Sequence, residues 1–76
     1  MLLLSREHIA SAADLTEAHG SLLGRMYAVA GELARTEGIA ERGYRLTTNV
    51  GAWGGQTVPH LHLHLMGGRA MGWPPG

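Results

Sequence analysis

The stretch His60-Leu61-His62-Leu63-His64-Leu65-Met66, near the end of the chain, decides how the rest is interpreted. Successive side chains of a β-strand point to opposite faces, so this spacing predicts a strand with three imidazoles on one surface and three leucines on the other. Threonine, lysine or glutamate would face water equally well on a strand, so three histidines out of three indicate chemistry. We predict a strand from Pro59 to Met66. Proline donates no ladder hydrogen bond, so this strand should begin at Pro59 or lie at a sheet edge.

The residues before this strand predict its partner. Tyr44 to Val50 alternates in polarity over a length typical of a strand. The glycine-rich segment that follows then forms the wide loop of a hairpin. In this arrangement Leu61, Leu63 and Leu65 pack on a helix, and the histidines occupy the opposite face.

An earlier segment predicts that helix. Asp14-Leu15-Thr16-Glu17 offers a capping side chain with an acid three residues later, which is typical of a helix start, and Gly38 is a natural stop. Between them, apolar residues recur at spacings that make one stripe: Leu15, Leu22, Met26, Val29, Ala30 and Leu33. The sequence therefore predicts an α+β fold, with one long helix over residues 14–37 packed on a small antiparallel sheet.

The loop between the two strands has the composition of an anion site. Gly54 and Gly55 let the backbone approach a ligand and expose its N–H groups, which suits phosphate. Asn49, Gln56 and Thr57 add neutral donors beside them. Paired glycines alone indicate an ordinary turn, but a glycine turn leading into three histidines is a rarer combination. We interpret it as a phosphate site that faces nucleophilic imidazoles.

A metal site is the main alternative for the histidines. Two histidines two apart on a strand can chelate zinc with a third ligand from elsewhere. His60 and His64 would lie about 13 Å apart at roughly 3.3 Å per residue, too far for all three histidines to share one ion. The chain has no cysteine and no HExxH motif to complete a common zinc set. A metal-binding module stays open, as does a polar strand without a function.

Length and composition limit the other classes of function. A chain of 76 residues is one domain at most and buries only about 60% of its unfolded surface, so we expect marginal stability. Six basic and six acidic residues cancel, which gives no positive field to attract a nucleic acid. The absence of cysteine fits a reducing cytoplasm. The apolar run Leu2 to Leu4 is too short for a membrane span or a signal peptide.

The segment from Asn49 to Gly76 resembles the histidine triad (HIT) family, and within it the Hint branch of nucleotide hydrolases. The resemblance rests on Gly54-Gly55-Gln56-Thr57-Val58, on His60-x-His62-x-His64, and on Gly67-Gly68-Arg69-x-Met71-Gly72-Trp73-Pro74-Pro75-Gly76. It implies a partial HIT-like domain. Residues 1–10 would be the end of a strand and a corner, residues 14–37 the helix, and residues 44–76 the histidine hairpin and the C-terminal segment.

The chain departs from the family pattern at its start. Family members carry, ahead of the point where this chain begins, an N-terminal helix and several strands that supply most of the base and ribose pocket, and a further histidine near the phosphate. Met1-Leu2-Leu3-Leu4 resembles the tail of one of those strands, and Ser5 stands where a proline is usual. We therefore expect a truncated gene product, a misplaced start codon or a fragment.

The resemblance also implies a mechanism. His62 would be the nucleophile that attacks the α-phosphorus of a purine nucleotide phosphoramidate or related substrate and forms a nucleotidyl-histidine intermediate. A backbone carbonyl near His60 would hold the other ring nitrogen of His62 in the right tautomer. Thr57 would assist the leaving group. A non-catalytic nucleotide-binding or dimerising remnant stays open as the alternative function.

Further residues receive binding roles from the same resemblance. The nucleotide and its phosphate would be held by Asn49, Gly55, Gln56, Thr57, His62, His64 and Trp73, and the catalytic set would be His60, His62, His64 and Thr57. No cofactor and no metal is implied, and the long helix would help to form a homodimer. Outside this set, we expect His8 at a strand-to-helix corner and His19 as a solvated helix residue, while the sequence does not decide whether Trp53 covers a ligand or caps the core.

Overall fold

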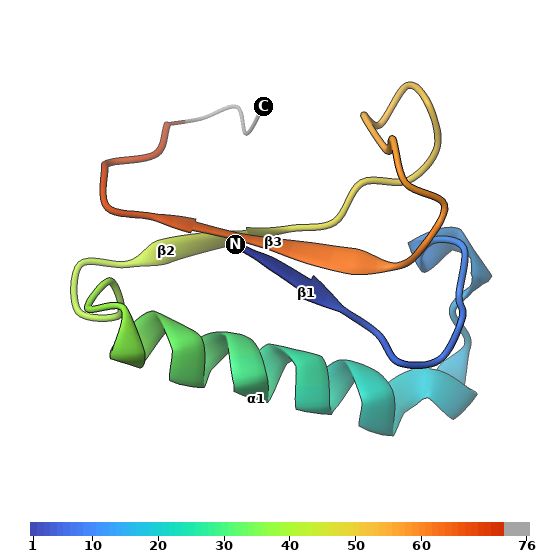
Figure 1. The fold of residues 1–76 in the computed structure, drawn as a ribbon, viewed down its shortest axis with the longest axis horizontal. Coiled ribbons are helices and arrows are strands. Elements are labelled where there is room, and N and C mark those ends of the chain that lie inside the picture. The colour runs from blue at the N-terminus through green and yellow to red at the C-terminus, as the bar shows by residue number, and fades with distance from the viewer. Residues whose placement is uncertain (73–76) are drawn as a thin grey trace.

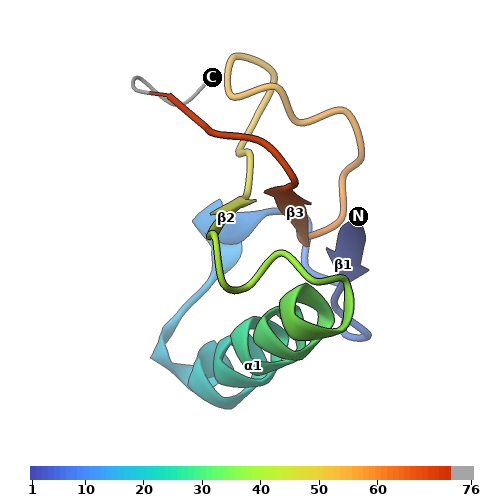
Figure 2. The ribbon, with the colours of Figure 1, turned by 90° about the vertical axis from the view of Figure 1, so that its left-hand side faces the viewer.

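The chain folds as one helix packed on a three-stranded antiparallel sheet, and the computed structural model describes residues 1–72. The helix lies along one face of the sheet, while the loop before the last strand and the C-terminal segment lie on the other side (Figures 1 and 2). The spatial order of the strands is β1-β3-β2. Their bounds, with that of the helix, are β1 Leu2–Leu4, α1 Gly20–Thr36, β2 Tyr44–Thr47 and β3 His62–Gly67. The predicted α+β architecture is confirmed.

The alternation of leucine and histidine separates the two faces of β3 as predicted. Leu63 pairs with Leu3 of β1, and Leu65 pairs with Leu46 of β2. Leu61, Leu63 and Leu65 are all buried, and the core cluster joins two of them to the helix: Ile9, Met26, Leu61 and Leu63. The other face of the sheet therefore carries His62 and His64.

The predicted start of this strand is wrong, and so is the expectation that Pro59 either opens the strand or lies at an edge. Strand β3 begins at His62 and is the central strand of the sheet. Just before it, the Leu61 N–H donates to the Ile9 carbonyl at 2.6 Å, and the His60 N–H donates to the Val58 carbonyl at 2.8 Å. These two bonds hold residues 58–61 in a bend, so these residues are not part of strand β3. Strand β2 likewise ends at Thr47, earlier than the predicted Val50.

The helix also begins later than predicted, at Gly20 instead of Asp14. Two short 3₁₀ turns, Ala12–Asp14 and Glu17–His19, precede it. Thr16 has extended backbone angles and caps the second turn, where its Oγ1 accepts from the Ala18 N–H. A capped and extended residue at this point separates the turns from the helix. Asp14, which looks like a cap in the sequence, is the last residue of the first turn.

The helix end follows the sequence closely. Gly38 has a φ of +77°, its N–H donates to the Arg35 carbonyl, and the Ile39 N–H donates to the Ala34 carbonyl. This is the Schellman arrangement, which satisfies the last carbonyls of a helix and favours glycine at the left-handed position. It places Ile39 beside the end of β3, where Gly67 lies against it.

The buried face of the helix is narrower than the predicted apolar stripe. It consists of Met26, Ala30 and Ala34, each four residues after the last. Leu15 lies ahead of the helix and Val29 is exposed, so both differ from the prediction. No helix within residues 1–72 has the length and apolar character needed to cross a membrane.

The close approach of β3 to the loop after the helix predicts an effect on stability. A methyl group added at Gly67 would lie 2.6 Å from Ile39 Cδ1 and 3.0 Å from Ile39 Cβ. We expect Gly67→Ala to lower the free energy of unfolding in urea by about 1–3 kcal/mol, because the side chain must move out of a packed position. Gly24→Ala is the control, since a methyl group there meets nothing within 4 Å, and it should raise stability by up to about 1 kcal/mol. Equal effects of the two variants would contradict the packing argument.

Candidate functional site

His62 has the geometry of a nucleophile whose reactive nitrogen is defined. Its Nδ1 lies 2.6 Å from the backbone carbonyl of His60. A carbonyl only accepts, so Nδ1 carries the proton, and a neutral ring then has its lone pair on Nε2. Within residues 1–72 no fully buried side-chain nitrogen or oxygen lacks a hydrogen-bond partner. His62 is only 7% exposed, and the part of the chain that the structure describes gives Nε2 no hydrogen-bond partner.

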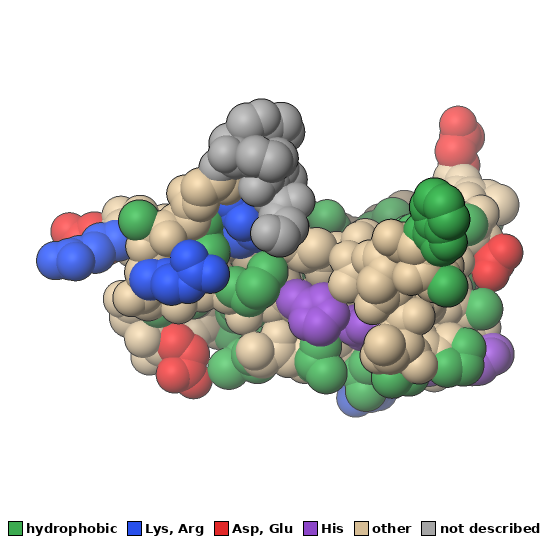
Figure 3. All heavy atoms as spheres, turned by 90° about the horizontal axis from the view of Figure 1, so that it is seen from above, with side chains coloured by type: hydrophobic (Ala, Val, Ile, Leu, Met, Phe, Trp, Pro, Cys, Tyr) green, Lys and Arg blue, Asp and Glu red, His purple; other side chains and the backbone are tan. Residues whose placement is uncertain are grey.

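His64 lies beside it on the same face of the sheet. The ring centroids of His62 and His64 are 5.0 Å apart, and the planes meet at 72°, edge to face. His64 is half-buried and lines a cleft of about 460 Å³ with other residues from β2, β3, the loop and the C-terminal segment: Arg45, Thr47, Asn49, Gly54, Met66, Arg69 and Met71. Figure 3 shows histidine atoms at the surface of this face, with arginine side chains to one side of them.

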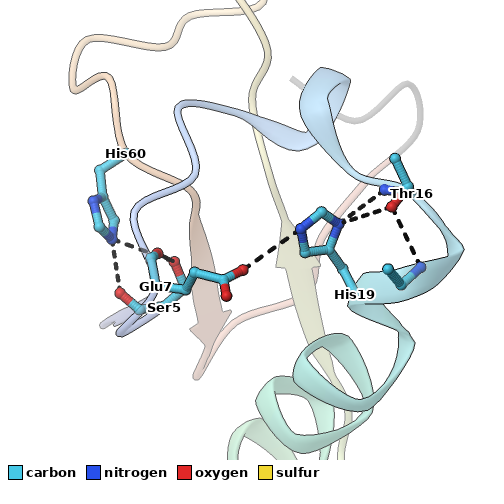
Figure 4. Close-up of polar contacts among 6 residues, drawn as sticks. Ser5, Glu7, Thr16, His19 and His60 are labelled. Carbon is cyan, nitrogen blue, oxygen red and sulfur yellow. Dashed lines mark hydrogen bonds and ion pairs between the residues drawn. The ribbon is translucent and has the colours of Figure 1, made fainter.

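The third histidine does not share this surface, which corrects the prediction of three aligned imidazoles. His60 precedes β3, and its Nε2 lies 2.7 Å from the Ser5 carbonyl and 3.3 Å from Ser5 Oγ (Figure 4). The ring of His8 lies against it, with 5.4 Å between the centroids. His60 therefore contributes its backbone carbonyl to the site, while its ring is turned toward the residues after β1.

Two arginines that the sequence analysis did not assign to the site line the same cleft. Arg45 pairs with Met66 across the sheet, and its Nη2 donates to the Gly72 carbonyl at 2.7 Å. Arg69 donates to the Ala70 carbonyl. Among residues 1–72 no acidic side chain lines the cleft, and the one ion pair in that part of the chain joins His19 and Glu7. The signal was present in the sequence, because Arg45 and Thr47 alternate along a strand next to the histidines.

The glycine loop does not offer the free N–H groups that were predicted. The N–H groups of Gly54, Gly55 and Gln56 donate to carbonyls of Gly51 and Ala52 at 3.0–3.2 Å. The loop is a turn closed on itself, and a side chain at Gly54 would collide with the Val50 carbonyl. These three N–H groups are therefore already bonded within the loop. This conformation does not support the prediction that the Gly55 N–H binds an anion.

The polar residues of the loop serve different purposes. Gln56 is anchored inside the chain: its Oε1 accepts from the Gly51 N–H, and its Nε2 donates to the carbonyls of Ala10 and Val58. This amide has no free donor for a nucleotide, contrary to its predicted binding role. Asn49 faces the cleft beside Gly55. Thr57 lines a separate hollow of about 300 Å³, so it is not brought together with His64.

The remaining residues considered in the sequence take varied positions. Trp53 is fully exposed, so it does not cap the core. His19 is the last residue of the second 3₁₀ turn and is half-buried, so it is not a solvated residue of α1; its Nδ1 accepts from the Thr16 N–H at 2.9 Å and its Nε2 pairs with Glu7 at 3.5 Å (Figure 4). His8 is exposed at the corner after β1. In the described part of the chain, no three His, Cys, Asp or Glu side chains are placed to share a metal ion. Trp73 lies outside the described residues.

The fold and the paired imidazoles define an α+β domain of the histidine triad type, and comparison with known proteins agrees. The sequence model of the HIT domain matches residues 1–71. An uncharacterized HIT-like protein of Synechococcus elongatus is 45% identical over 76 residues, which cover 100% of this chain and 66% of that protein. Purine nucleoside phosphoramidase of Escherichia coli is 52% identical over 59 residues, covering 78% of this chain and 50% of the relative.

A solved structure shows the same arrangement. The crystal structure of a HIT family hydrolase from Legionella pneumophila matches with a TM-score of 0.95 at 48% identity, covering 99% of this chain and 67% of that one. The chain therefore belongs to the HIT family, as the resemblance of its histidine strand implied. It spans 66% of the length of the Synechococcus relative and 50% of that of the Escherichia coli enzyme.

The anchoring of Gln56 predicts that this side chain stabilises the loop. Gln56→Ala removes three hydrogen bonds and leaves the carbonyls of Ala10 and Val58 without this donor, so we expect unfolding to become easier by about 1–3 kcal/mol. The neighbouring Thr57→Ala, at an exposed side chain, should change stability by about 0.5 kcal/mol or less. Urea denaturation of both variants measures this. A Gln56 variant as stable as the Thr57 variant would show that the loop does not depend on the amide.

Proposed function

We propose that the protein is a nucleotide hydrolase or transferase that uses His62 Nε2 to attack the α-phosphorus of a nucleotide phosphoramidate or related substrate. One observation carries the proposal. The His60 carbonyl fixes the proton of His62 on Nδ1, which leaves a lone pair on Nε2 of a ring that lies 5.0 Å from the ring of His64, a residue that lines the cleft. A neutral imidazole with a defined tautomer is an effective nucleophile near neutral pH.

The chemistry takes two steps. In the first, Nε2 forms a bond to phosphorus while the bond from phosphorus to the leaving nitrogen breaks, and the nitrogen departs as an amine after taking a proton from solvent. In the second, water attacks the same phosphorus and releases the mononucleotide, which returns the ring to its starting state. Splitting one displacement into two lowers each barrier. The hydrogen bond from Nδ1 to the His60 carbonyl also stabilises the positive charge that the ring carries in the intermediate.

The cleft supplies groups suited to the phosphate. Arg45 and Arg69 bring positive charge, no described lining residue carries a carboxylate, and the side chains of His64 and Asn49 add further polar groups. Guanidinium groups hold phosphate oxygens through paired, charge-assisted hydrogen bonds. The resemblance assigns Thr57, which lines another hollow, to the leaving group, whereas the steps above take the proton from solvent.

The substrate class is taken from a relative. The Escherichia coli enzyme is named a purine nucleoside phosphoramidase, and the HIT domain model that matches residues 1–71 spans the whole histidine strand. A purine nucleoside phosphoramidate is therefore the substrate we assign to this chain. The chain spans half the length of that enzyme, so a nucleotide-binding remnant without turnover is the competing function.

The His62 assignment predicts a loss of turnover on substitution. The parent should release AMP from adenosine 5′-phosphoramidate, and His62→Ala should lower the rate by about three orders of magnitude or more, measured by chromatography. His19→Ala is the histidine control, because His19 caps a turn outside the cleft, and its rate per folded molecule should match the parent. Unchanged turnover in His62→Ala would refute the nucleophile. A parent that binds AMP in calorimetry without turnover would support the remnant instead.

The proposal includes a homodimer in the cytoplasm. Both β1 and β2 are edge strands, and the helix exposes two large apolar side chains, Tyr27 at 51% and Val29 at 38%. Unpaired strand edges and exposed apolar side chains favour association with a second chain. Sedimentation velocity should give the mass of two chains at micromolar concentration. A single-chain mass across that range would contradict the dimer without affecting the chemistry of His62.

A further inference from the structure

Ser5 is a buried polar residue that the mechanism above does not use. It lies directly after β1, is only 5% exposed, and stands at a position where the family resemblance has proline. Its N–H donates to the Leu61 carbonyl at 3.4 Å, so it lies across from the peptide that leads into the histidine strand. A buried hydroxyl is costly unless its hydrogen bonds are made, so its partners indicate its purpose.

The hydroxyl group of Ser5 has its proton committed. Oγ donates to the Glu7 carbonyl at 2.7 Å, and a carbonyl can only accept. The side of Oγ that faces His60 Nε2 at 3.3 Å therefore offers lone pairs alone. The Ser5 carbonyl lies 2.7 Å from the same nitrogen and is a second acceptor. One residue thus presents two acceptors to His60 Nε2, which must carry the proton of that ring.

The rings of His60 and His62 are linked through one peptide group, the one that contains the His60 carbonyl. The His60 ring is held at Ser5 by Nε2, while the His60 carbonyl receives the proton of His62 Nδ1 at 2.6 Å. Rotation of the His60 backbone would turn this carbonyl away from His62. Anchoring the ring at Ser5 restrains that rotation from the side-chain end, in addition to the bond from Leu61 N–H to the Ile9 carbonyl.

We infer that Ser5 is a positioning residue for the proposed reaction: its Oγ and carbonyl hold the His60 ring so that the His60 carbonyl keeps the proton of His62 on Nδ1. This inference rests on the proposed function for its effect on turnover, but the tautomer of His62 is measured independently. Ser5 touches neither the cleft nor the reacting nitrogen and acts through His60.

The test uses matched variants of the full chain. Ser5→Thr keeps a hydroxyl and Ser5→Val replaces it with a methyl group of the same shape, so the pair differs in the hydrogen bond alone. Ser11→Ala is the second control, because Ser11 caps a nearby turn through its own hydroxyl and is not connected to His60. Nitrogen-15 histidine labelling with two-bond proton–nitrogen correlation, at a pH about two units above the ordinary histidine pKa, reports which ring nitrogen carries the proton.

The parent, Ser5→Thr and Ser11→Ala should show His62 with its proton on Nδ1 alone. Ser5→Val should show both tautomers and a kcat about three- to ten-fold lower with KM unchanged, which is the effect of one lost hydrogen bond. A Ser5→Val protein with His62 in the parent's single tautomer would overturn the inference. If the tautomer shifts as expected but none of the proteins turns over substrate, the positioning role stands and the proposed function fails.

Discussion

The hydrogen bond from His62 Nδ1 to the His60 carbonyl is the contact on which the proposed chemistry of this molecule depends. An imidazole has two nitrogens, and only the one without a proton can attack phosphorus. Because the acceptor is a carbonyl 2.6 Å away, the proton is assigned to Nδ1 and the lone pair to Nε2. The strand places the ring beside His64, but this carbonyl decides which atom of the ring is reactive.

That carbonyl is held by the residues on either side of its peptide group. After it, Leu61 is 2% exposed and Leu63 3%, and burying two leucines stabilises this position by roughly 1.5–3 kcal/mol each. Before it, the His60 ring is fixed at Ser5. The peptide between them is also bonded through the Leu61 N–H to Ile9. Apolar packing therefore fixes where the strand lies, and polar contacts fix how its first peptide is turned.

The features that the sequence predicts well depend on local geometry. A period of two puts leucines on one face of a strand and histidines on the other in any sheet, so the buried leucines were predictable. Glycine after a helix favours the left-handed conformation, so the helix end at Gly38 was predictable as well. The start of β3 was not, because it is set by bonds to Ile9, a residue distant in sequence. The predicted start of the helix was wrong for a related reason. Asp14 and Thr16 both look like caps in the sequence, and only the extended backbone at Thr16 shows which of the two is a cap.

The candidate site differs from its sequence prediction in the source of its anion-binding groups. Backbone N–H groups in a compact loop find carbonyls within the loop, and those of Gly54, Gly55 and Gln56 do so here. Positive charge comes instead from Arg45 and Arg69, whose long side chains reach the cleft from the edge strand and the C-terminal segment. The two tasks of the site are thereby separated. In the proposed mechanism, the charge for holding phosphate lies toward β2, while the nucleophile is oriented from the β1 side.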